Sequence, residues 1–428
     1  MQTNKLKTLI KESKLSVCLD SRQIKKGDYF IPVVGENHDG HRFIEAALKN
    51  GAAGVIEENE LYDLARFKIS LIKPKIIGVT GSSGKTTTTQ FIYQLLATKH
   101  STTLGHLNTK LGLAVDTINE MNLDCKYFIA EMGMDRAGEL EETTELFSPN
   151  VAVITTINET HMEKLGSLEK IAKAKFGIAK NLKKEGTLIL NADNEAIQNY
   201  VKRHRPKVDL LWFSLKDSDD INPKKLNKDI FKNFKIPGEH NKSNLLASLS
   251  VLKALNEPID NYIEQITQLQ LPKGRLTKLE GINNSVILDD TYNANPESTK
   301  AALKVLDEIK GKRKIAVLGN MLELGDYEKE GHEKVGEAVT QAKVDFLVTV
   351  GDLGEIISKT AQVNRKIHLD KSTDFKEALD KGEVKIKEGD VFLVKGSQGA
   401  RMEKITEVLL ANPGRDRAKL VRQDVRWE

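Results

Sequence analysis

Glycine, lysine and threonine residues between positions 81 and 87 have the composition of a phosphate-binding loop. The apolar run Lys75–Thr80 stops at the string GSSGKTT, and a helical pattern follows it. Glycines let backbone N–H groups approach phosphate oxygens closely, while Lys85 and Thr86 supply an ammonium group for the terminal phosphates and a hydroxyl group for Mg²⁺. The sequence therefore predicts a nucleoside triphosphate site. The predicted contacts are Gly81, Ser82, Ser83, Gly84, Lys85, Thr86 and Thr87.

The spacing of this loop differs from the common form GxxxxGK[ST], because Val79 occupies the position of the first glycine. An ordinary Gly/Ser turn between a strand and a helix is the alternative interpretation.

Polar residues also follow the next two apolar runs. Glu131 lies in the run at 127–132, and Asn158 and His161 follow the run at 151–157. The carboxyl ends of parallel strands share one edge of a sheet, so these side chains are expected beside the phosphate loop. Mg²⁺ prefers one or two carboxylates with phosphate oxygens and water, which makes Glu131 a predicted metal ligand together with Thr86. His161 is expected within reach of the metal or phosphate.

The elements that position these residues belong to an α/β protein with three predicted domains, at 1–73, 74–272 and 273–428. The first is a small α/β unit with a helix over 41–49. In the second, apolar strands alternate with helical patterns, which is typical of a mostly parallel sheet covered on both faces. The predicted strands of these two domains lie at 17–19, 29–33, 54–56, 75–80, 127–132, 151–157 and 187–191.

The third domain repeats the alternation and is predicted to be Rossmann-like. Its strands are expected at 286–289, 314–318, 346–350 and 391–394, each running into a loop rich in Gly, Asp or Asn. The dinucleotide fingerprint GxGxxG is absent from the sequence, so a dinucleotide is not expected there. The polar stretch at 216–235 is predicted to be a solvated excursion or hairpin. The sequence leaves open whether the basic tail at 412–428 is more than a solvated extension.

Composition excludes several classes of protein. Lys and Arg number 65 against 61 Asp and Glu, too small an excess to indicate nucleic acid or membrane binding. Cys18 and Cys125 show no metal-type pairing, which fits a reducing compartment. The sequence has neither the apolar core of a signal peptide nor a run of about 20 apolar residues that could span a bilayer. We therefore expect a cytoplasmic protein.

Strings along nearly the whole chain resemble those of the Mur ligases, ATP-dependent amide-forming enzymes of peptidoglycan precursor synthesis. Two of them, AEMGM and DDTYNANP, point to the member that adds D-alanyl-D-alanine, and the DNPR signature of the diaminopimelate-adding member is missing. The matching strings are DSR (20–22), GENHDGH (35–41), GVTGSSGKTT (78–87), Asn108 with Leu111 and Gly112, AEMGM (130–134), Asn158 with His161, GEHNKSN (238–244), DDTYNANPES (289–298), LGNMLELG (318–325) and VKGSQGARME (394–403).

The resemblance implies a role for each matching residue. The N-terminal domain would hold the uridine nucleotide, the central domain ATP, and the C-terminal domain the incoming amine. Asn241 and Asn244 would lie on the adenine side, and Arg275 and Asp290 would complete the nucleotide site from the third domain. The implied substrate contacts are Ser21, Arg22, Gly35, Asp39 and His41 for the UDP-sugar, Asn108 for the muramoyl peptide, and Asn158, Tyr292 and Asn293 for the remaining substrate groups.

Lys175 acquires a function through the resemblance alone. Its position in a helical pattern is typical of an exposed lysine. In relatives the matching lysine is N6-carboxylated and binds a second Mg²⁺ beside His161, which requires an amine with a depressed pKa. Lys173 lies two residues away and is the less favoured candidate. Thr109 departs from the family pattern, where many relatives carry a second asparagine.

The expected reaction joins D-alanyl-D-alanine to UDP-N-acetylmuramoyl-tripeptide through an acyl phosphate, with ATP and two Mg²⁺ ions. Lys85, Glu131, His161 and Lys175 are the expected catalytic residues, in a monomer whose C-terminal domain closes over ATP by a hinge near residue 272. The alternatives are another Mur-family or folylpolyglutamate ligase, or a non-catalytic P-loop protein that senses UDP-sugars. The sequence leaves open whether diaminopimelate or lysine ends the acceptor tripeptide, and whether D-alanyl-D-lactate is tolerated.

Overall fold

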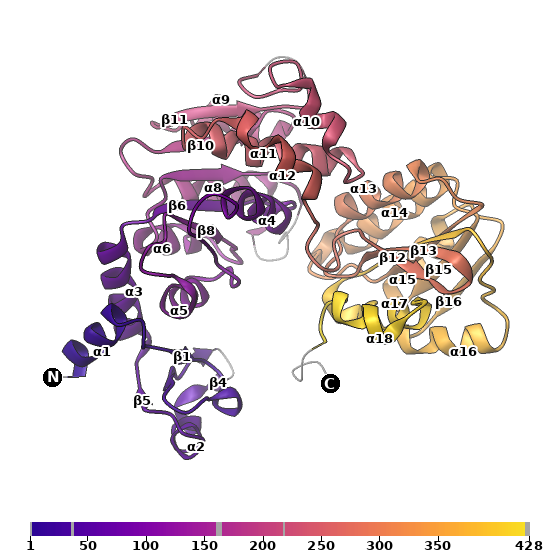
Figure 1. Ribbon diagram of the computed structural model, residues 1–428. Helices are drawn as coiled ribbons and strands as arrows, with labels where there is room; N and C mark the ends of the chain where they lie inside the picture. The colour runs from indigo at the N-terminus through magenta and orange to yellow at the C-terminus, as the bar shows by residue number, and fades with distance from the viewer. Residues whose placement is uncertain (1, 36–37, 160–164, 217–218, 424–428) are drawn as a thin grey trace.

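Three α/β units follow one another along the chain (Figure 1). The computed structural model describes residues 2–35, 38–159, 165–216 and 219–423. Each of the three main sheets lies within one of the ranges 1–73, 74–272 and 273–428, so the predicted α/β class is confirmed. The domain boundaries themselves stay predictions. Within the described ranges, no helix has both the length and the apolar character needed to cross a membrane.

The N-terminal unit is a small parallel sheet of order β1-β2-β5. The predicted helix at 41–49 is only partly α-helical: residues Gly40–Phe43 form a 3₁₀ turn, because the Asp39 side chain accepts from the His41 N–H at 3.0 Å. The elements are α1 (Gln2–Lys11), β1 (Val17–Cys18), β2 (Tyr29–Phe30), β3 (Val34–Gly35), β4 (His38–Asp39), α2 (Ile44–Lys49), β5 (Gly54–Val55) and α3 (Glu58–Ile72).

The central unit contains a fully parallel six-stranded sheet of order β11-β10-β9-β6-β8-β7. Its strands are β6 (Lys75–Thr80), β7 (Thr102–Leu104), β8 (Tyr127–Glu131), β9 (Val151–Ile154), β10 (Thr187–Asn191) and β11 (Asp209–Phe213). Strand β6 lies between β8 and β9. The strands β7 and β8 lie on one side of β6 and β9, β10 and β11 on the other, which makes β6 a topological switch point. Ligand sites of open parallel sheets lie beyond the carboxyl ends of the strands at such a point.

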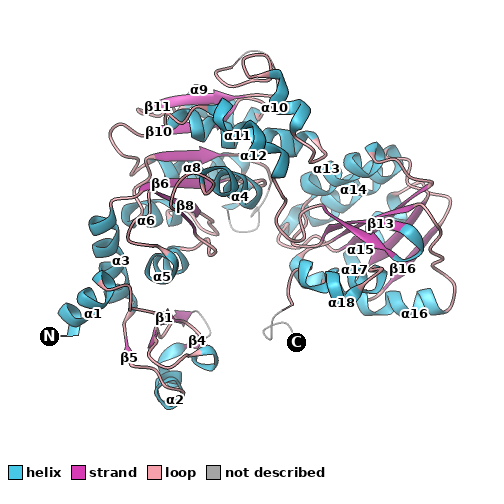
Figure 2. Ribbon diagram, in the orientation of Figure 1, coloured by secondary structure: helices cyan, strands magenta, loops and turns pink. Residues whose placement is uncertain are grey.

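Helices cover both faces of this sheet (Figure 2). They are α4 (Lys85–Leu96), α5 (Lys110–Glu120), α6 (Glu139–Leu146), α8 (Leu168–Phe176), α9 (Glu195–Arg203), α10 (Lys228–Asn233), α11 (Glu239–Ala254) and α12 (Ile263–Gln268). Side chains alternate between two buried cores, so Ile76 and Phe128 face one and Ile77 and Ile129 the other.

The prediction of a solvated excursion at 216–235 agrees with its exposed charged residues but is wrong for three apolar ones. Ile221, Ile230 and Phe234 are buried in the core that α4 and α11 share. These three apolar residues are widely spaced among charged ones, so the polar composition of the stretch gave no indication that they are buried.

The C-terminal unit contains a six-stranded sheet of order β12-β13-β17-β14-β15-β16, in which only the β12–β13 pair is antiparallel among the described strands. Its elements are β12 (Thr277–Gly281), β13 (Ser285–Asp290), α13 (Pro296–Glu308), β14 (Arg313–Gly319), α14 (Glu328–Gln341), β15 (Phe346–Val350), α15 (Asp352–Thr360), β16 (Lys366–Leu369), α16 (Phe375–Asp380), β17 (Asp390–Lys395), α17 (Glu403–Leu409) and α18 (Pro413–Asp416).

The described part of the C-terminal tail is not solvated throughout. Leu420 and Val421 are buried, and Leu420 belongs to the core of the C-terminal unit. The tail therefore packs as part of the fold.

Candidate active site

The phosphate loop is shaped by two glycines that no other residue could replace without displacement. Gly84 has φ +85° at the N-terminus of α4, and a Cβ there would lie 2.5 Å from Asn244 Oδ1. A Cβ on Gly81 would overlap the Thr155 hydroxyl. Lys85 folds back over the loop and donates from Nζ to the Gly81 carbonyl at 2.8 Å. The loop therefore places backbone N–H groups, a helix N-terminus and an ammonium group together, which favours an anion.

A cavity of about 530 Å³ lies between this loop and the C-terminal unit. Most of the residues predicted from the sequence line it, and they come from both units. They are Ser82, Ser83, Gly84, Lys85, Thr86, Thr87, Asn108, Glu131, Asn158, Asn241, Asn244, Arg275, Asp290, Tyr292 and Asn293.

Burial lowers the pKa of Lys85, and nearby charges act in both directions. The Glu131 carboxylate favours the charged ammonium, whereas the Arg275 guanidinium, which arrives from the C-terminal unit, disfavours it. Lys85, Glu131 and Arg275 therefore share one electrostatic environment although they come from three separate parts of the chain.

Lys175 lies on α8 and does not line the cavity, but it is close enough to Lys85 for the two charges to interact. Only 1% of it is exposed, whereas Lys173 is exposed, so the interpretation of Lys175 as a surface lysine is wrong. Burial, reinforced by the charge of Lys85, lowers the pKa of Lys175 far below its usual range. Within the described ranges, Lys175 forms no hydrogen bond or ion pair. These surroundings favour a neutral, nucleophilic amine.

Helix α11 brings polar residues to the cavity from its first turns. Asn241 donates from Nδ2 to the Pro237 carbonyl at 2.8 Å, and Asn244 Oδ1 accepts from the Thr88 hydroxyl at 3.4 Å. His240 also lines the cavity and was not among the predicted site residues. Burial lowers its pKa, while Asp290 and Lys395 act on it in opposite directions.

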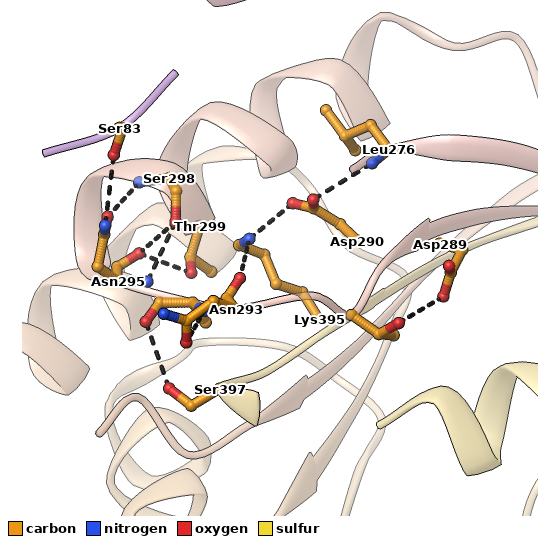
Figure 3. A network of polar contacts seen from close by, with 12 residues as sticks. Ser83, Leu276, Asp289, Asp290, Asn293, Asn295, Ser298, Thr299, Lys395 and Ser397 are labelled. Atoms are coloured by element: carbon orange, nitrogen blue, oxygen red, sulfur yellow. Dashed lines mark hydrogen bonds and ion pairs between the residues drawn. The ribbon is translucent and has the colours of Figure 1, made fainter. Parts of the chain in front are cut away.

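The C-terminal wall of the cavity is organised by a buried ion pair (Figure 3). Lys395 Nζ lies 2.7 Å from Asp290 Oδ2 and donates to the Asn293 carbonyl at 2.9 Å. Asp290 also accepts from the Leu276 N–H at 3.2 Å. Lys395 was not among the predicted site residues, because nothing in the string VKGSQG indicates its partner. The pairing of β13 with β17 places Lys395 opposite Asp290.

Arg275 is presented to the cavity by Tyr292. Its guanidinium carbon lies 4.2 Å from the centre of the Tyr292 ring, an arrangement that orients a cation without neutralising it. Its Nε is buried and has no hydrogen-bond partner among the described residues. A free buried donor at the wall of a cavity fits an anionic ligand.

A hydrogen bond between Asn295 and Ser83 connects the C-terminal unit directly to the phosphate loop. Asn295 Nδ2 donates to Ser83 Oγ at 3.3 Å (Figure 3). The Asn295 Oδ1 atom also accepts from the Ser298 N–H at 2.8 Å, so the same side chain caps α13. Asn295 was missed as a site residue, although the string NPES already indicates a capped helix.

Comparisons with known proteins match the chain along most of its length. The models for the Mur ligase family catalytic domain, the Mur ligase middle domain and the Mur ligase glutamate ligase domain match residues 16–78, 79–252 and 274–398. UDP-N-acetylmuramoyl-tripeptide–D-alanyl-D-alanine ligase of Bacillus subtilis is 32% identical over 93% of each chain. The chain belongs to the Mur ligase family.

Two further relatives agree with this assignment. The Escherichia coli ligase of the same name is 28% identical over 93% of this chain and 94% of its own. A solved structure of MurF ligase from Thermotoga maritima in complex with ADP has a TM-score of 0.78 and 28% identity, covering 92% of this chain and 97% of its own. The three-domain fold predicted for a Mur ligase is therefore confirmed.

The predicted uridine-nucleotide residues of this Mur ligase lie apart from the cavity, in the N-terminal unit. Arg22 forms two hydrogen bonds with Asp20, at 2.9 and 2.8 Å, and the buried Ser21 accepts through its carbonyl from Asn50. His41 contacts Asp39 at 2.8 Å and Glu57 at 3.2 Å. Gly35 lies in β3, which pairs with β4. The structure thus does not gather these residues with the phosphate loop.

Three of the four metal ligands predicted for this Mur ligase belong to the described residues: Thr86, Glu131 and Lys175. His161 lies outside the described residues. Thr86 and Glu131 line the same cavity, and no group of three His, Cys, Asp or Glu side chains in the described ranges could hold a metal by itself. One hydroxyl and one carboxylate fit Mg²⁺ that takes its other ligands from phosphate and water.

Proposed function

We propose that the protein is an ATP-dependent ligase that joins D-alanyl-D-alanine to UDP-N-acetylmuramoyl-tripeptide, giving UDP-N-acetylmuramoyl-pentapeptide, ADP and phosphate. The observation that carries the proposal is the cavity in which the phosphate loop of the central unit faces Arg275 and Tyr292 of the C-terminal unit. The names of the relatives with 26–32% identity over most of the chain, and the ADP in one related structure, support it.

The chemistry requires an activated carboxylate, because a peptide carboxylate at neutral pH has no leaving group. A carboxylate oxygen attacks the γ-phosphorus of ATP, ADP leaves, and an acyl phosphate forms. The amine of D-alanyl-D-alanine then attacks the acyl carbon, and phosphate and a proton are released. Two anions must approach each other in the first step, so positioning and positive charge supply most of the catalysis.

Lys85 and the N-terminus of α4 supply that positive charge in our proposal. Lys85 would hold the transferred phosphoryl group, and Asn241, Asn244, Arg275 and Asp290 would complete the nucleotide site. Thr86, Glu131 and His161 would hold Mg²⁺, which when bound screens the approaching anions. An acyl phosphate hydrolyses in water, so contact between the C-terminal unit and the loop, seen in the Asn295–Ser83 hydrogen bond, would exclude water.

Lys175 would act as an N6-carboxylated residue. Its buried neutral amine attacks the carbon of CO₂ and loses a proton, which converts a cation into a carboxylate-like ligand for a second Mg²⁺. The burial of Lys175 beside the charge of Lys85 supports this assignment, since a carbamate would be attracted where an ammonium is repelled.

The remaining predicted residues would bind the substrates. We propose that Ser21, Arg22, Gly35, Asp39 and His41 contact the UDP group, that Asn108 and Asn158 contact the muramoyl peptide, and that Tyr292 and Asn293 contact the dipeptide. We propose that the protein acts as a monomer. The use of ATP and a nucleotide-linked precursor supports a reaction in the cytoplasm.

An assay of phosphate release tests the proposal. Purified protein is incubated with ATP, Mg²⁺, UDP-N-acetylmuramoyl-tripeptide and D-alanyl-D-alanine, and each component is omitted in turn, with Lys85→Met as the inactive control. We expect release only with the complete mixture. Release with a different amine would favour another ligase of the family. Binding of UDP-sugars without any phosphate release would favour a sensing protein.

A further inference from the structure

The end of the described chain packs behind the loop that forms the C-terminal wall of the cavity. Leu420 and Val421 are buried, and the Arg422 side chain is only 5% exposed. The tail contacts Thr291 and Tyr292, which directly follow Asp290 of the buried ion pair in the sequence. The tail is therefore in a position to influence the loop although it does not line the cavity.

Arg422 connects this loop to helix α17. Its guanidinium forms an ion pair with Glu403 at 2.8 Å and donates to two consecutive backbone carbonyls, those of Thr291 and Tyr292, the latter at 3.1 Å. Glu403 is also held by Arg401 at 2.6 Å. A planar guanidinium with several donors can make these bonds at the same time and thereby restrict the loop backbone.

Val421 makes a second contact with the same region. Gly274 has φ +65°, and a Cβ there would lie 2.7 Å from Val421 Cγ1. The Tyr292 N–H donates to the Gly274 carbonyl at 3.1 Å, next to Arg275, whose guanidinium lies over the Tyr292 ring. The tail thus packs against the place where the segments that carry Arg275 and Tyr292 are hydrogen-bonded to each other.

We propose that Arg422 is a positioning residue of the nucleotide site: it holds the Thr291–Tyr292 backbone so that the Tyr292 ring presents Arg275 to the cavity. The inference rests on the proposed function, because it takes ATP as the ligand that Arg275 meets. A tail that only stabilised the fold would change the free energy of unfolding without changing the affinity for nucleotide.

Two variants separate these roles. Arg422→Lys keeps a cation for Glu403 but cannot bind both carbonyls and the carboxylate together, whereas Glu403→Gln removes the ion pair and leaves the carbonyl bonds of Arg422 available. Arg417→Lys is the matched control, because Arg417 is an exposed tail arginine that contacts Glu407 at 3.1 Å.

The affinity of each protein for a non-hydrolysable ATP analogue with Mg²⁺ is measured by calorimetry, with UDP-N-acetylmuramoyl-tripeptide as the second ligand. We expect Arg422→Lys to weaken analogue binding about tenfold and to leave the UDP-ligand affinity unchanged. Glu403→Gln should lower the thermal midpoint with a smaller loss of analogue affinity, and Arg417→Lys should match the wild type. Analogue affinity within twofold of the wild type in folded Arg422→Lys would overturn the inference.

Hydrogen exchange of the wild-type protein provides a test that needs no variant. Coupling is reciprocal, so analogue binding should slow amide exchange in a peptide that covers Leu420–Arg422. Protection of residues 81–87 without any change at the tail would overturn the inference and leave the proposed function intact. If the wild-type chain bound no analogue at all, the proposed function would fail, and this inference with it.

Discussion

Two lysines, Lys175 in the central unit and Lys395 in the C-terminal unit, are equally buried but have opposite surroundings. Each is 1% exposed. Lys395 contacts Asp290 and the Asn293 carbonyl, whereas Lys175 has the Lys85 charge nearby and forms no hydrogen bond or ion pair with a described residue. Burial lowers the pKa of both, but Asp290 opposes the effect at Lys395 while Lys85 reinforces it at Lys175.

This difference separates a structural cation from a reactive amine. A buried ammonium with a carboxylate and a carbonyl is satisfied and fixes the loop that carries them. A buried amine without an acceptor is costly as a cation and therefore favours the neutral form. The same residue type thus supports two functions, and substitutions at the two positions should have different effects.

The largest effect is expected from Lys175→Ala. Loss of the carboxylated side chain would remove a proposed metal ligand, so the rate of phosphate release should fall at least about 100-fold. Acetate or propionate should restore part of the rate by occupying the vacated space. Lys173→Ala is the matched control on the same helix and should retain full activity. Full activity in Lys175→Ala would eliminate the carbamate assignment.

Substitution of Lys395 should lower the free energy of unfolding more than substitution of Lys175, the reverse of the order expected for activity. Lys395→Met leaves Asp290 buried without its partner, and the free energy of unfolding should fall by about 3–5 kcal/mol. Lys175→Met, in CO₂-depleted buffer without nucleotide, removes an amine that has no acceptor, so the change should stay below about 1 kcal/mol. Calorimetric unfolding of both variants measures the contrast. Equal losses would show that the surroundings of the two lysines do not differ in the way we describe.

Local patterns were sufficient to predict four of the six described strands of the central sheet and its functional edge, but not β7 and β11. Apolar runs identified β6, β8, β9 and β10, and the carboxyl-end rule placed Lys85 and Glu131 together before any geometry was known. The roles of these residues stay predictions.

What the sequence could not reveal depends on contacts between distant segments. Lys395 meets Asp290 because β17 inserts between β13 and β14, an order that leaves no local signal. The burial of Lys175 depends on how α8 packs against the sheet. Arg422 binds backbone carbonyls, which any residue type at 291 and 292 would supply. Such contacts are invisible to spacing and composition alone.

Glu257 extends the comparison to a half-buried carboxylate at the opposite end of β8 from Glu131. It accepts from the Tyr127 and Tyr262 hydroxyls at 2.6 and 3.0 Å, from Lys126 at 3.1 Å, and lies 2.9 Å from His100. Burial pushes its pKa upward, but the hydrogen bonds outweigh this and lower the pKa to about 2.

Because the pKa of Glu257 is lower in the folded protein, its ionised carboxylate stabilises the fold at pH values above about 4.5, its pKa in the unfolded chain. This stabilisation is lost as the pH falls from about 4.5 towards about 2. Glu257→Gln should therefore lower the free energy of unfolding at pH 7 by about 2 kcal/mol and should weaken its decline between pH 5 and pH 3. Denaturant unfolding at both pH values checks this, with the exposed Glu264→Gln as control. An unchanged pH dependence in Glu257→Gln would show that other groups carry the acid sensitivity.

The smallest effect is expected from loss of the Asn295–Ser83 hydrogen bond, which joins the C-terminal unit to the central unit. Asn295→Ser keeps a good helix N-cap for α13, but the shorter side chain no longer reaches Ser83. Loss of one hydrogen bond of about 1 kcal/mol should weaken binding of the ATP analogue about fivefold at an unchanged thermal midpoint. Ser298→Ala removes the reciprocal cap and keeps the bridge, so it should lower the thermal midpoint slightly at unchanged affinity. If Ser298→Ala instead lowered the analogue affinity and Asn295→Ser lowered only the thermal midpoint, the hydrogen bond to Ser83 would stabilise helix α13 and not the contact between the units. The arrangement of the cavity would then have to depend on Arg275 and its contact with the Tyr292 ring.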